Sequence, residues 1–222
     1  MHRLLVMVLA SLLLAHGSTA QETQIRFRTL ALAADAFPEL WVVAGAKPLS
    51  ITFSDTQPSQ PYKADRANPF AIYQGPLDEK GKPQKPVAIK LPAKTDSILL
   101  LGWMLGDKSG FLAIDDPFET FHHDDWLVIN TTNSAMFIQI GEKNQPVKIV
   151  PGSHAKIRTS VPAGTGAAIT IAASIDGQLK KIFTSYWPIF DDKRGIVLIG
   201  RVGEDYKVNY IRDQVQAPPK VN

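Results

Sequence analysis

The 222-residue sequence contains no cysteine. It therefore has no disulfide bond, catalytic thiol, thiolate zinc site or type 1 copper site, because each of these needs cysteine. The sequence also has little excess of either charge, since 24 basic and 21 acidic residues give a formal net charge of +3. The lysines gather only loosely, at 78–86, and no basic helix is evident. We therefore expect no nucleic-acid partner.

Long hydrophobic runs are rare, and the one at the start of the chain indicates export. Arg3 precedes an apolar stretch at 4–15, and the small residues Ser18 and Ala20 follow it. This pattern is typical of a signal peptide, and we expect cleavage after Ala20. The stretch is shorter than the roughly 20 residues that a membrane-spanning helix needs. We expect a secreted or periplasmic protein with no transmembrane segment after cleavage.

The remaining sequence is a series of short apolar segments separated by proline, glycine and asparagine, which is typical of β-strands. Two segments alternate strictly. In 25–32, Ile25 and Phe27 share one face and Arg26 and Arg28 the other, and 136–141 alternates in the same way. Such alternation predicts strands with one face toward solvent. The sequence therefore predicts an all-β protein with antiparallel β-sandwich architecture.

Two pairs of segments suggest an internal repeat. Residues 37–53 align with 134–150, and residues 110–130 align loosely with 181–200. The sequence thus predicts two tandem sandwiches after the signal peptide, rather than one large sandwich. The expected boundaries are 1–20 for the signal peptide, 21–115 and 116–213 for the two repeats, and 214–222 for a disordered tail. The pattern resembles that of secreted immunoglobulin-like sandwiches without their cysteine pair, and this resemblance implies a fold but no function.

Histidine and aspartate at the expected domain boundary are candidate metal ligands. Three histidines follow the signal peptide: His122, His123 and His154. On a strand, His122 and Asp124 point the same way. With His154 from a neighbouring strand they would form a site for a metal-binding protein or a metal-dependent hydrolase. The alternative is a polar linker with solvated side chains.

A long proline-rich loop at 55–69 is the first candidate for a binding surface, since such loops are often functional. Its contact residues would be Tyr62, Lys63 and Arg66, with Tyr73 close by in sequence. The four tryptophans are expected in the cores. A carbohydrate-binding module, in contrast, would expose at least two aromatic side chains on one face.

Catalytic motifs are missing from the sequence. There is no G-x-S-x-G segment, and the adjacent aspartates suit tight turns. Asn130 begins a glycosylation sequon, although asparagine and threonine also favour a turn at this point. We expect no cofactor and no enzyme activity. The first hypothesis is an exported, non-catalytic binding or structural module of the cell envelope, with an unknown protein or glycan as partner; the alternatives are the carbohydrate-binding module and the metal protein.

Overall fold

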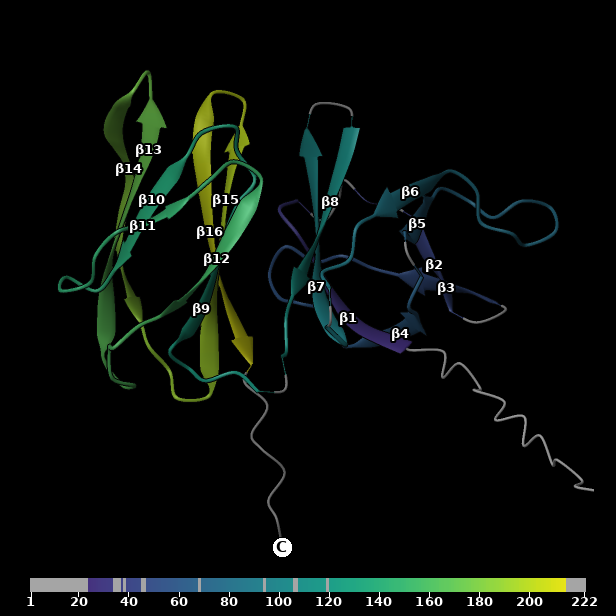
Figure 1. Cartoon of the computed structure of the whole chain (residues 1–222), viewed down its shortest axis with the longest axis horizontal. Helices are drawn as coiled ribbons and strands as arrows, with labels where there is room; N and C mark the ends of the chain where they lie inside the picture. Colours follow the sequence, from purple (N-terminus) through teal and green to yellow (C-terminus); the bar gives the residue numbers. More distant parts are fainter. Residues whose placement is uncertain are drawn as a thin grey trace, which may run out of the picture.

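The chain folds into four β-sheets stacked as layers. The computed structural model describes residues 24–214 except 34–36, 38, 45–46, 68, 94, 106–107 and 119. The predicted signal peptide and residues 215–222 of the predicted tail lie outside the described residues. The described residues form sixteen strands in four four-stranded sheets and contain no helix that could cross a membrane. The all-β, tandem-sandwich prediction is confirmed (Figure 1).

The first sandwich has an inner and an outer sheet. The first inner sheet has the order β4-β1-β7-β8, with β1 and β7 parallel, and the first outer sheet has the order β3-β2-β5-β6. The strands are β1 Gln24–Ala31, β2 Leu40–Ala44, β3 Lys47–Ile51, β4 Tyr62–Asp65, β5 Phe70–Gln74, β6 Pro86–Ile89, β7 Ser97–Leu105 and β8 Lys108–Asp115.

The second sandwich repeats this topology strand for strand. Its inner sheet is β12-β9-β15-β16, with β9 and β15 parallel, and its outer sheet is β11-β10-β13-β14. The strands are β9 Asp125–Asn130, β10 Met136–Ile140, β11 Val147–Ile149, β12 Ser153–Arg158, β13 Gly166–Ile175, β14 Gln178–Pro188, β15 Lys193–Val202 and β16 Asp205–Gln214. Gln214, which the sequence assigned to the tail, is therefore the last residue of a strand.

The strand orders test the two sequence alignments. Residues 37–53 hold β2 and β3, and residues 134–150 hold β10 and β11, which are the second and third strands of each repeat, so this alignment is confirmed. The second alignment is wrong. It matches β8 and β9 with β14 and β15, whereas the sheet order makes β8 equivalent to β16 and β14 equivalent to β6.

Each sandwich has its own core between its inner and outer sheets. In the second core, Tyr210 stacks on Trp126 and Trp187, with ring centroids 5.3 and 4.3 Å away. Trp126 and Trp187 are buried, as the sequence predicted. Trp103 is partly buried and packs against the apolar cluster between the inner sheets, whereas the prediction fails for Trp41, which is partly exposed on the outer face.

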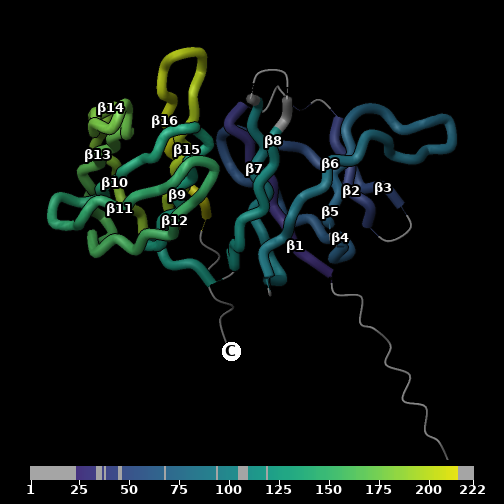
Figure 2. The backbone as a smooth tube through the Cα atoms, turned by 45° about the horizontal axis from the view of Figure 1, so that its top comes forward, coloured from purple at the N-terminus to yellow at the C-terminus, as the bar shows by residue number. Residues whose placement is uncertain are grey.

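A third apolar cluster joins the two inner sheets, which lie side by side in Figure 2. The first sandwich contributes Leu30, Leu32, Leu99, Leu101 and Ile114, and the second contributes Leu127, Ile129, Ile196, Leu198 and Ile211. The central strands of both inner sheets, β1 and β7 in the first and β9 and β15 in the second, are therefore buried on both faces. The prediction that segment 25–32 turns one face to solvent is wrong, because that face packs against the second sandwich.

The two inner sheets meet through equivalent faces. Leu99 pairs with Ile114 across β7 and β8, and Ile196 pairs with Ile211 across β15 and β16. These two pairs occupy the same positions in their repeats, and all four side chains lie in the third cluster. The packing thus resembles the isologous interface of a symmetric dimer, formed here within one chain.

Candidate functional site

Four buried charges form a network at one end of the interface between the sandwiches. Arg28 on β1 donates two hydrogen bonds of 2.7 Å to the carboxylate of Asp213 on β16. Arg194 on β15 reaches Asp213 at 2.8 Å and Asp116, just after β8, at 2.9 Å. Arg28 also reaches Asp116, at 3.2 Å. None of the four residues is more than 7% exposed, so two charges of each sign cancel in a dry environment.

The linker between the sandwiches covers this network. The Arg194 guanidinium lies 3.2 Å from the ring centre of Phe121, and that of Arg28 lies 4.6 Å from the ring centre of Phe118. Both phenylalanines are buried. A cation over an aromatic face is attracted by the ring quadrupole, and this attraction grows when water is excluded. The interpretation of this segment as a solvated linker is therefore wrong for Asp116, Phe118 and Phe121.

The network follows the symmetry of the repeats. Asp213 pairs with Arg194 across β15 and β16, and the Asp116 backbone N–H donates to the Ser97 carbonyl at the same position of the first repeat. Burial lowers the pKa of Arg28, but the hydrogen bond and charge of Asp213 outweigh it and raise this pKa above its usual range. Arg28 is therefore charged, and the network links β1 and Asp116 of the first sandwich to β15 and β16 of the second.

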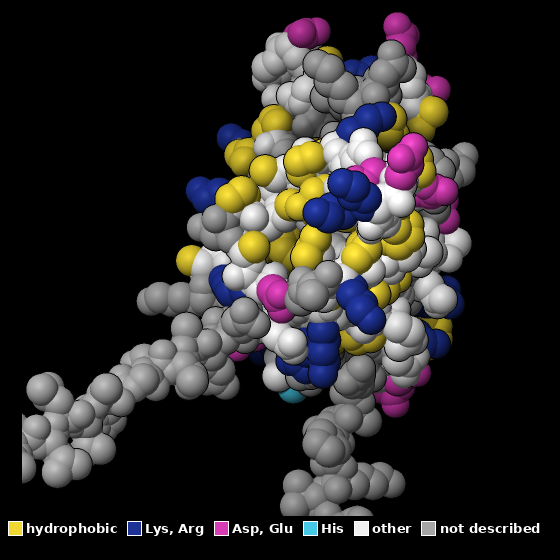
Figure 3. All heavy atoms as spheres, turned by 90° about the vertical axis from the view of Figure 1, so that its right-hand side faces the viewer, with side chains coloured by type: hydrophobic (Ala, Val, Ile, Leu, Met, Phe, Trp, Pro, Cys, Tyr) yellow, Lys and Arg dark blue, Asp and Glu magenta, His cyan; other side chains and the backbone are white. Residues whose placement is uncertain are grey.

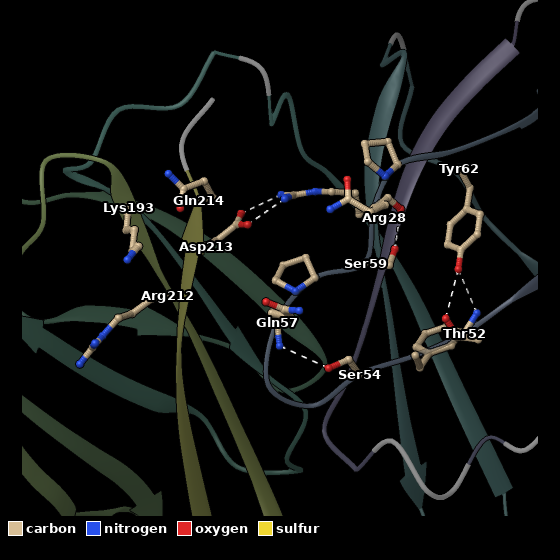
Figure 4. Close-up of a pocket in the computed structure, with 14 residues that line it drawn as sticks. Arg28, Thr52, Ser54, Gln57, Ser59, Tyr62, Lys193, Arg212, Asp213 and Gln214 are labelled. Carbon is tan, nitrogen blue, oxygen red and sulfur yellow. Dashed lines mark hydrogen bonds and ion pairs between the residues drawn. The ribbon is translucent and has the colours of Figure 1, made fainter. Parts of the chain in front are cut away.

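A cleft of about 760 Å³ opens beside the network, between the sandwiches. One wall is the 52–61 loop with Tyr62, and the other is formed by Lys193 and residues 212–214. Figure 4 shows Arg28 reaching across the cleft toward Asp213, while the Lys193 and Arg212 side chains run away from the loop. The cationic groups of Lys193 and Arg212 are thus not directed at a ligand in the cleft.

Most polar groups of this loop are already bonded. The Ser59 hydroxyl accepts from the Thr29 N–H at 3.0 Å, and the Tyr62 hydroxyl bonds Thr52 at 3.2 Å. Within the described chain, the side-chain amides of Gln57 and Gln60 have no partner. Asp213 is the only carboxylate among the described lining residues, and it is held by two arginines. The cleft therefore offers hydrogen bonds but no free acid–base pair.

The predicted binding residues separate in the structure. Tyr62 lines the cleft and stacks on Phe27, with ring centroids 5.3 Å apart, so it also belongs to the edge of the first core. Lys63 is exposed on β4, a strand within the segment predicted as a loop. Arg66 donates to the carbonyls of Thr95 and Pro92, so its role is structural. Tyr73 lies on β5 in the other sheet.

The predicted metal ligands do not come together. Among the described residues, no group of three or more His, Asp or Glu side chains is placed to hold a metal ion. His122 is in the turn before β9, where its carbonyl accepts from the Asp125 N–H. His154 pairs with Ile129, which lies four residues beyond Asp125, the first residue of β9. At the rise of a strand this is a displacement of about 13 Å from the start of β9. His154 instead faces the first sandwich, beside Asp115.

Asn130 is a structural residue. Its side-chain amide is buried and donates to the carbonyls of Ser134, Ile149 and Val150 at 2.8–3.2 Å. Its Oδ1 accepts from the N–H and hydroxyl of Thr132. This arrangement is the turn that the sequence favoured, and it leaves the amide nitrogen inaccessible to a glycan.

The first outer sheet carries an apolar outer face that sequence analysis missed. Leu40 and Val42 are buried in the first core, so the alternate residues Trp41 and Val43 point outward. The outward positions of this sheet are Trp41, Val43, Pro48, Ser50, Ala71, Tyr73, Pro86 and Ala88. All but Ser50 are apolar or aromatic. Figure 3 shows hydrophobic side chains gathered on this face, with lysines and arginines among them.

Two aromatic residues occupy the middle of this apolar face. Trp41 on β2 and Tyr73 on β5 are directly opposite each other, and both are partly exposed. The Trp41 indole N–H donates to the Gly75 carbonyl at 3.0 Å, which fixes the ring orientation. Its neighbour on β3 is the small residue Ser50, so the strand beside it leaves the indole open. The alternation of Leu40–Trp41–Val42–Val43 is the sequence signal that would have identified this face.

The second outer sheet provides a direct comparison. There Phe137 takes the place of Trp41, and Ala172 takes the place of Tyr73. Lys148 takes the place of Ser50, and its ammonium lies 5.9 Å from the Phe137 ring centre. The neighbouring outward residues Gln139 and Thr170 are polar. The outer faces of the two sheets therefore differ at their centres, where the first has two aromatic residues opposite each other and the second has Phe137 opposite Ala172.

Comparison with known proteins adds no family to these observations. No model of a known protein family matches the chain, and no curated protein is similar to it in sequence.

Proposed function

We propose that the protein is an exported, non-catalytic module that binds polysaccharide of the cell envelope through the outer face of β2, β3, β5 and β6. The observation that carries the proposal is the pair Trp41 and Tyr73 on an otherwise apolar sheet face that points away from the first core. The C–H face of a sugar ring packs well on an aromatic ring, and a flat sheet presents such rings to an extended chain. Export is proposed from the signal-peptide pattern of residues 1–20 alone.

The contrast between the repeats supports a binding role for this face. An exposed apolar patch on a soluble protein commonly marks an interaction surface. The equivalent face of the second repeat is mixed, because Gln139, Lys148 and Thr170 are polar whereas Phe137, Ala172 and Tyr186 are not. Both repeats have this topology, so the topology alone does not account for the nearly continuous apolar face of the first.

The cleft between the sandwiches is the weaker candidate. Large pockets at domain interfaces are the usual first hypothesis for a binding site. Here, however, Arg28 and Asp213 neutralise each other, and the cationic ends of Lys193 and Arg212 point away from the loop. A ligand would meet chiefly the amides of Gln57 and Gln60.

Co-sedimentation of the purified protein with insoluble peptidoglycan, chitin and cellulose tests the proposal. We expect binding to at least one of them, weakened about tenfold or more in the Trp41→Ala/Tyr73→Ala double variant, a change of about 1.4 kcal/mol. Phe137→Ala, at the equivalent place in the second repeat, is the matched control and should bind like the wild type.

Two further measurements keep the test decisive. A Trp41→Phe variant retains an aromatic ring and should keep much of the binding, as expected if the ring stacks on the sugar. Thermal unfolding of each variant shows whether a loss of binding is due to misfolding. The proposal is wrong if the wild type binds none of the three polysaccharides, or if the double variant binds as tightly as the wild type. If the wild type self-associates and the double variant does not, the ligand of this face is a second copy of the chain and not a glycan.

A further inference from the structure

The exposed ring of Tyr186 forms a second aromatic surface, separate from that of Trp41 and Tyr73. It lies near the end of β14 and is 68% exposed, the highest value among the large hydrophobic side chains described. Its ring occupies the space above Gly166 on the neighbouring strand, where a Cβ atom would lie 2.1 Å from the ring Cε1. Gly166 therefore allows the ring to rest on the backbone of β13, so the ring is supported on one side and open to solvent on the other.

A pocket of about 330 Å³ with a mixed polar and apolar lining adjoins this ring. It is lined by the turn after β10, residues 141–144, and by residues 160–162 that precede β13. The turn is well fixed, because the Gln139 amide donates to the carbonyls of Glu142 and Asn144 at 3.0 and 2.8 Å. Exposed Glu142 and Lys143 lie on the same turn, and no partner for either side chain is found in the described chain.

An exposed aromatic ring beside a fixed turn that carries charged side chains has the chemistry to hold a sugar. The ring supplies a stacking surface, and the exposed carboxylate of Glu142 and ammonium of Lys143 can bond the sugar hydroxyls. The Asn144 amide already donates to the Ile140 carbonyl, and the Ser160 hydroxyl lies 3.5 Å from the Asn144 side-chain oxygen, so these two groups are bonded within the site. A saccharide can stack on the ring and hydrogen-bond to the two charged side chains.

Tyr186 and the aromatic pair of the first repeat lie on opposite outer sheets. Tyr186 is on the second outer sheet, whereas Trp41 and Tyr73 are on the first, and the two inner sheets lie between them (Figure 1). The apolar cluster and the buried charge network join those inner sheets firmly. The two outer faces are therefore held apart and cannot engage the same short stretch of one chain.

We propose that Tyr186 and its pocket form a second saccharide site, so that the protein is bivalent and bridges polysaccharide chains. This inference rests on the proposed function, because bridging requires that the first outer face also binds. Bivalency raises the apparent affinity for a surface and links separate particles.

Aggregation of peptidoglycan and chitin particles by the full protein, followed by light scattering, tests the inference. The wild type should bind and aggregate the particles. Tyr186→Ala should still sediment with them, through the first outer face, but should lose most of the aggregation, and Gly166→Ala should do the same by displacing the ring. Leu179→Ala, on the same strand and 63% exposed, is the matched control and should aggregate the particles normally.

The outcomes separate the two proposals. Wild-type protein that binds but does not aggregate particles, or a Tyr186→Ala variant that aggregates them fully, overturns the bivalent site and leaves the first site standing. Protein that binds no particles overturns both proposals. Measurement of the molar mass in solution is part of the test, because aggregation by a dimeric protein through the first face alone would also overturn the assignment of Tyr186.

Discussion

Removing one charge from the buried network should destabilise the protein severely. In an Asp213→Asn variant the shape of the side chain is kept, but Arg28 and Arg194 share only Asp116, so one positive charge remains uncompensated among buried groups. Breaking a buried pair in this way costs about 3–5 kcal/mol. For a chain of this size each kcal/mol lowers the melting temperature by about 2–4 °C, so a fall of roughly 6–20 °C is expected.

An exposed ion pair at the same interface is the matched control. Lys156 on β12 lies 3.1 Å from Asp115 of the first sandwich, and both side chains are exposed. Pairs of this kind contribute about 0–1 kcal/mol, so Lys156→Ala should change the melting temperature little. Urea unfolding and calorimetry would measure both variants.

A double variant tests whether charge imbalance is the cause. Arg28→Met with Asp213→Leu removes one charge of each sign and leaves Arg194 paired with Asp116 at 2.9 and 3.1 Å. Apolar replacement of a buried pair is often close to neutral, so this variant should recover most of the stability lost in Asp213→Asn. If Asp213→Asn lost no more stability than Lys156→Ala, or if the double variant were the least stable, the account of the network would be refuted.

Three other predictions concern the interface and the second sandwich. Gly200→Ala should destabilise the protein by about 1–3 kcal/mol in urea unfolding, because its Cβ would lie 2.3 Å from the Leu32 side chain packed across the interface. Burial and the charge of Lys156 lower the pKa of His154, although the charges of two aspartates oppose this shift. The unfolded chain therefore binds a proton at His154 more readily than the folded protein, so stability should fall as the pH drops from about 6.5 through the folded pKa. His154→Gln should flatten that part of the pH–stability profile. Asn130→Ala orphans buried carbonyl groups and should cost about 1–3 kcal/mol in thermal unfolding, with no change of mass from a lost glycan.

Local alternation was enough to predict the strands of the outer sheets. In β10, Met136, Ile138 and Ile140 are buried and Phe137 and Gln139 are partly exposed, as the pattern indicates. This success has a physical reason, because an outer sheet has one dry and one wet face and period two reports that difference. The same alternation in β2 placed Trp41 outward, but a general preference of tryptophan for cores obscured it.

The inner sheets were harder to interpret, although they carried a signal. Strands buried on both faces are continuous apolar runs, and β7 contains four consecutive buried residues, Ile98 to Leu101. β1 carries Arg28 among its outward residues, which favoured a solvent-facing interpretation. The network could not be deduced from local pattern, since Arg28 and Asp213 are 185 residues apart and each resembles an ordinary surface charge in sequence.

The tandem arrangement explains why the binding surfaces proposed here are on the outer sheets. The inner faces of the two repeats are committed to each other, with Asp116 and Asp213 at equivalent places in the network. Substitutions there must preserve both packing and charge balance, so these faces are poorly suited to acquire a ligand. The outer faces do not contact the other sandwich, so their residues can differ between the repeats without disturbing the interface. The aromatic pair of the first outer sheet and the single exposed ring of Tyr186 on the second are such differences.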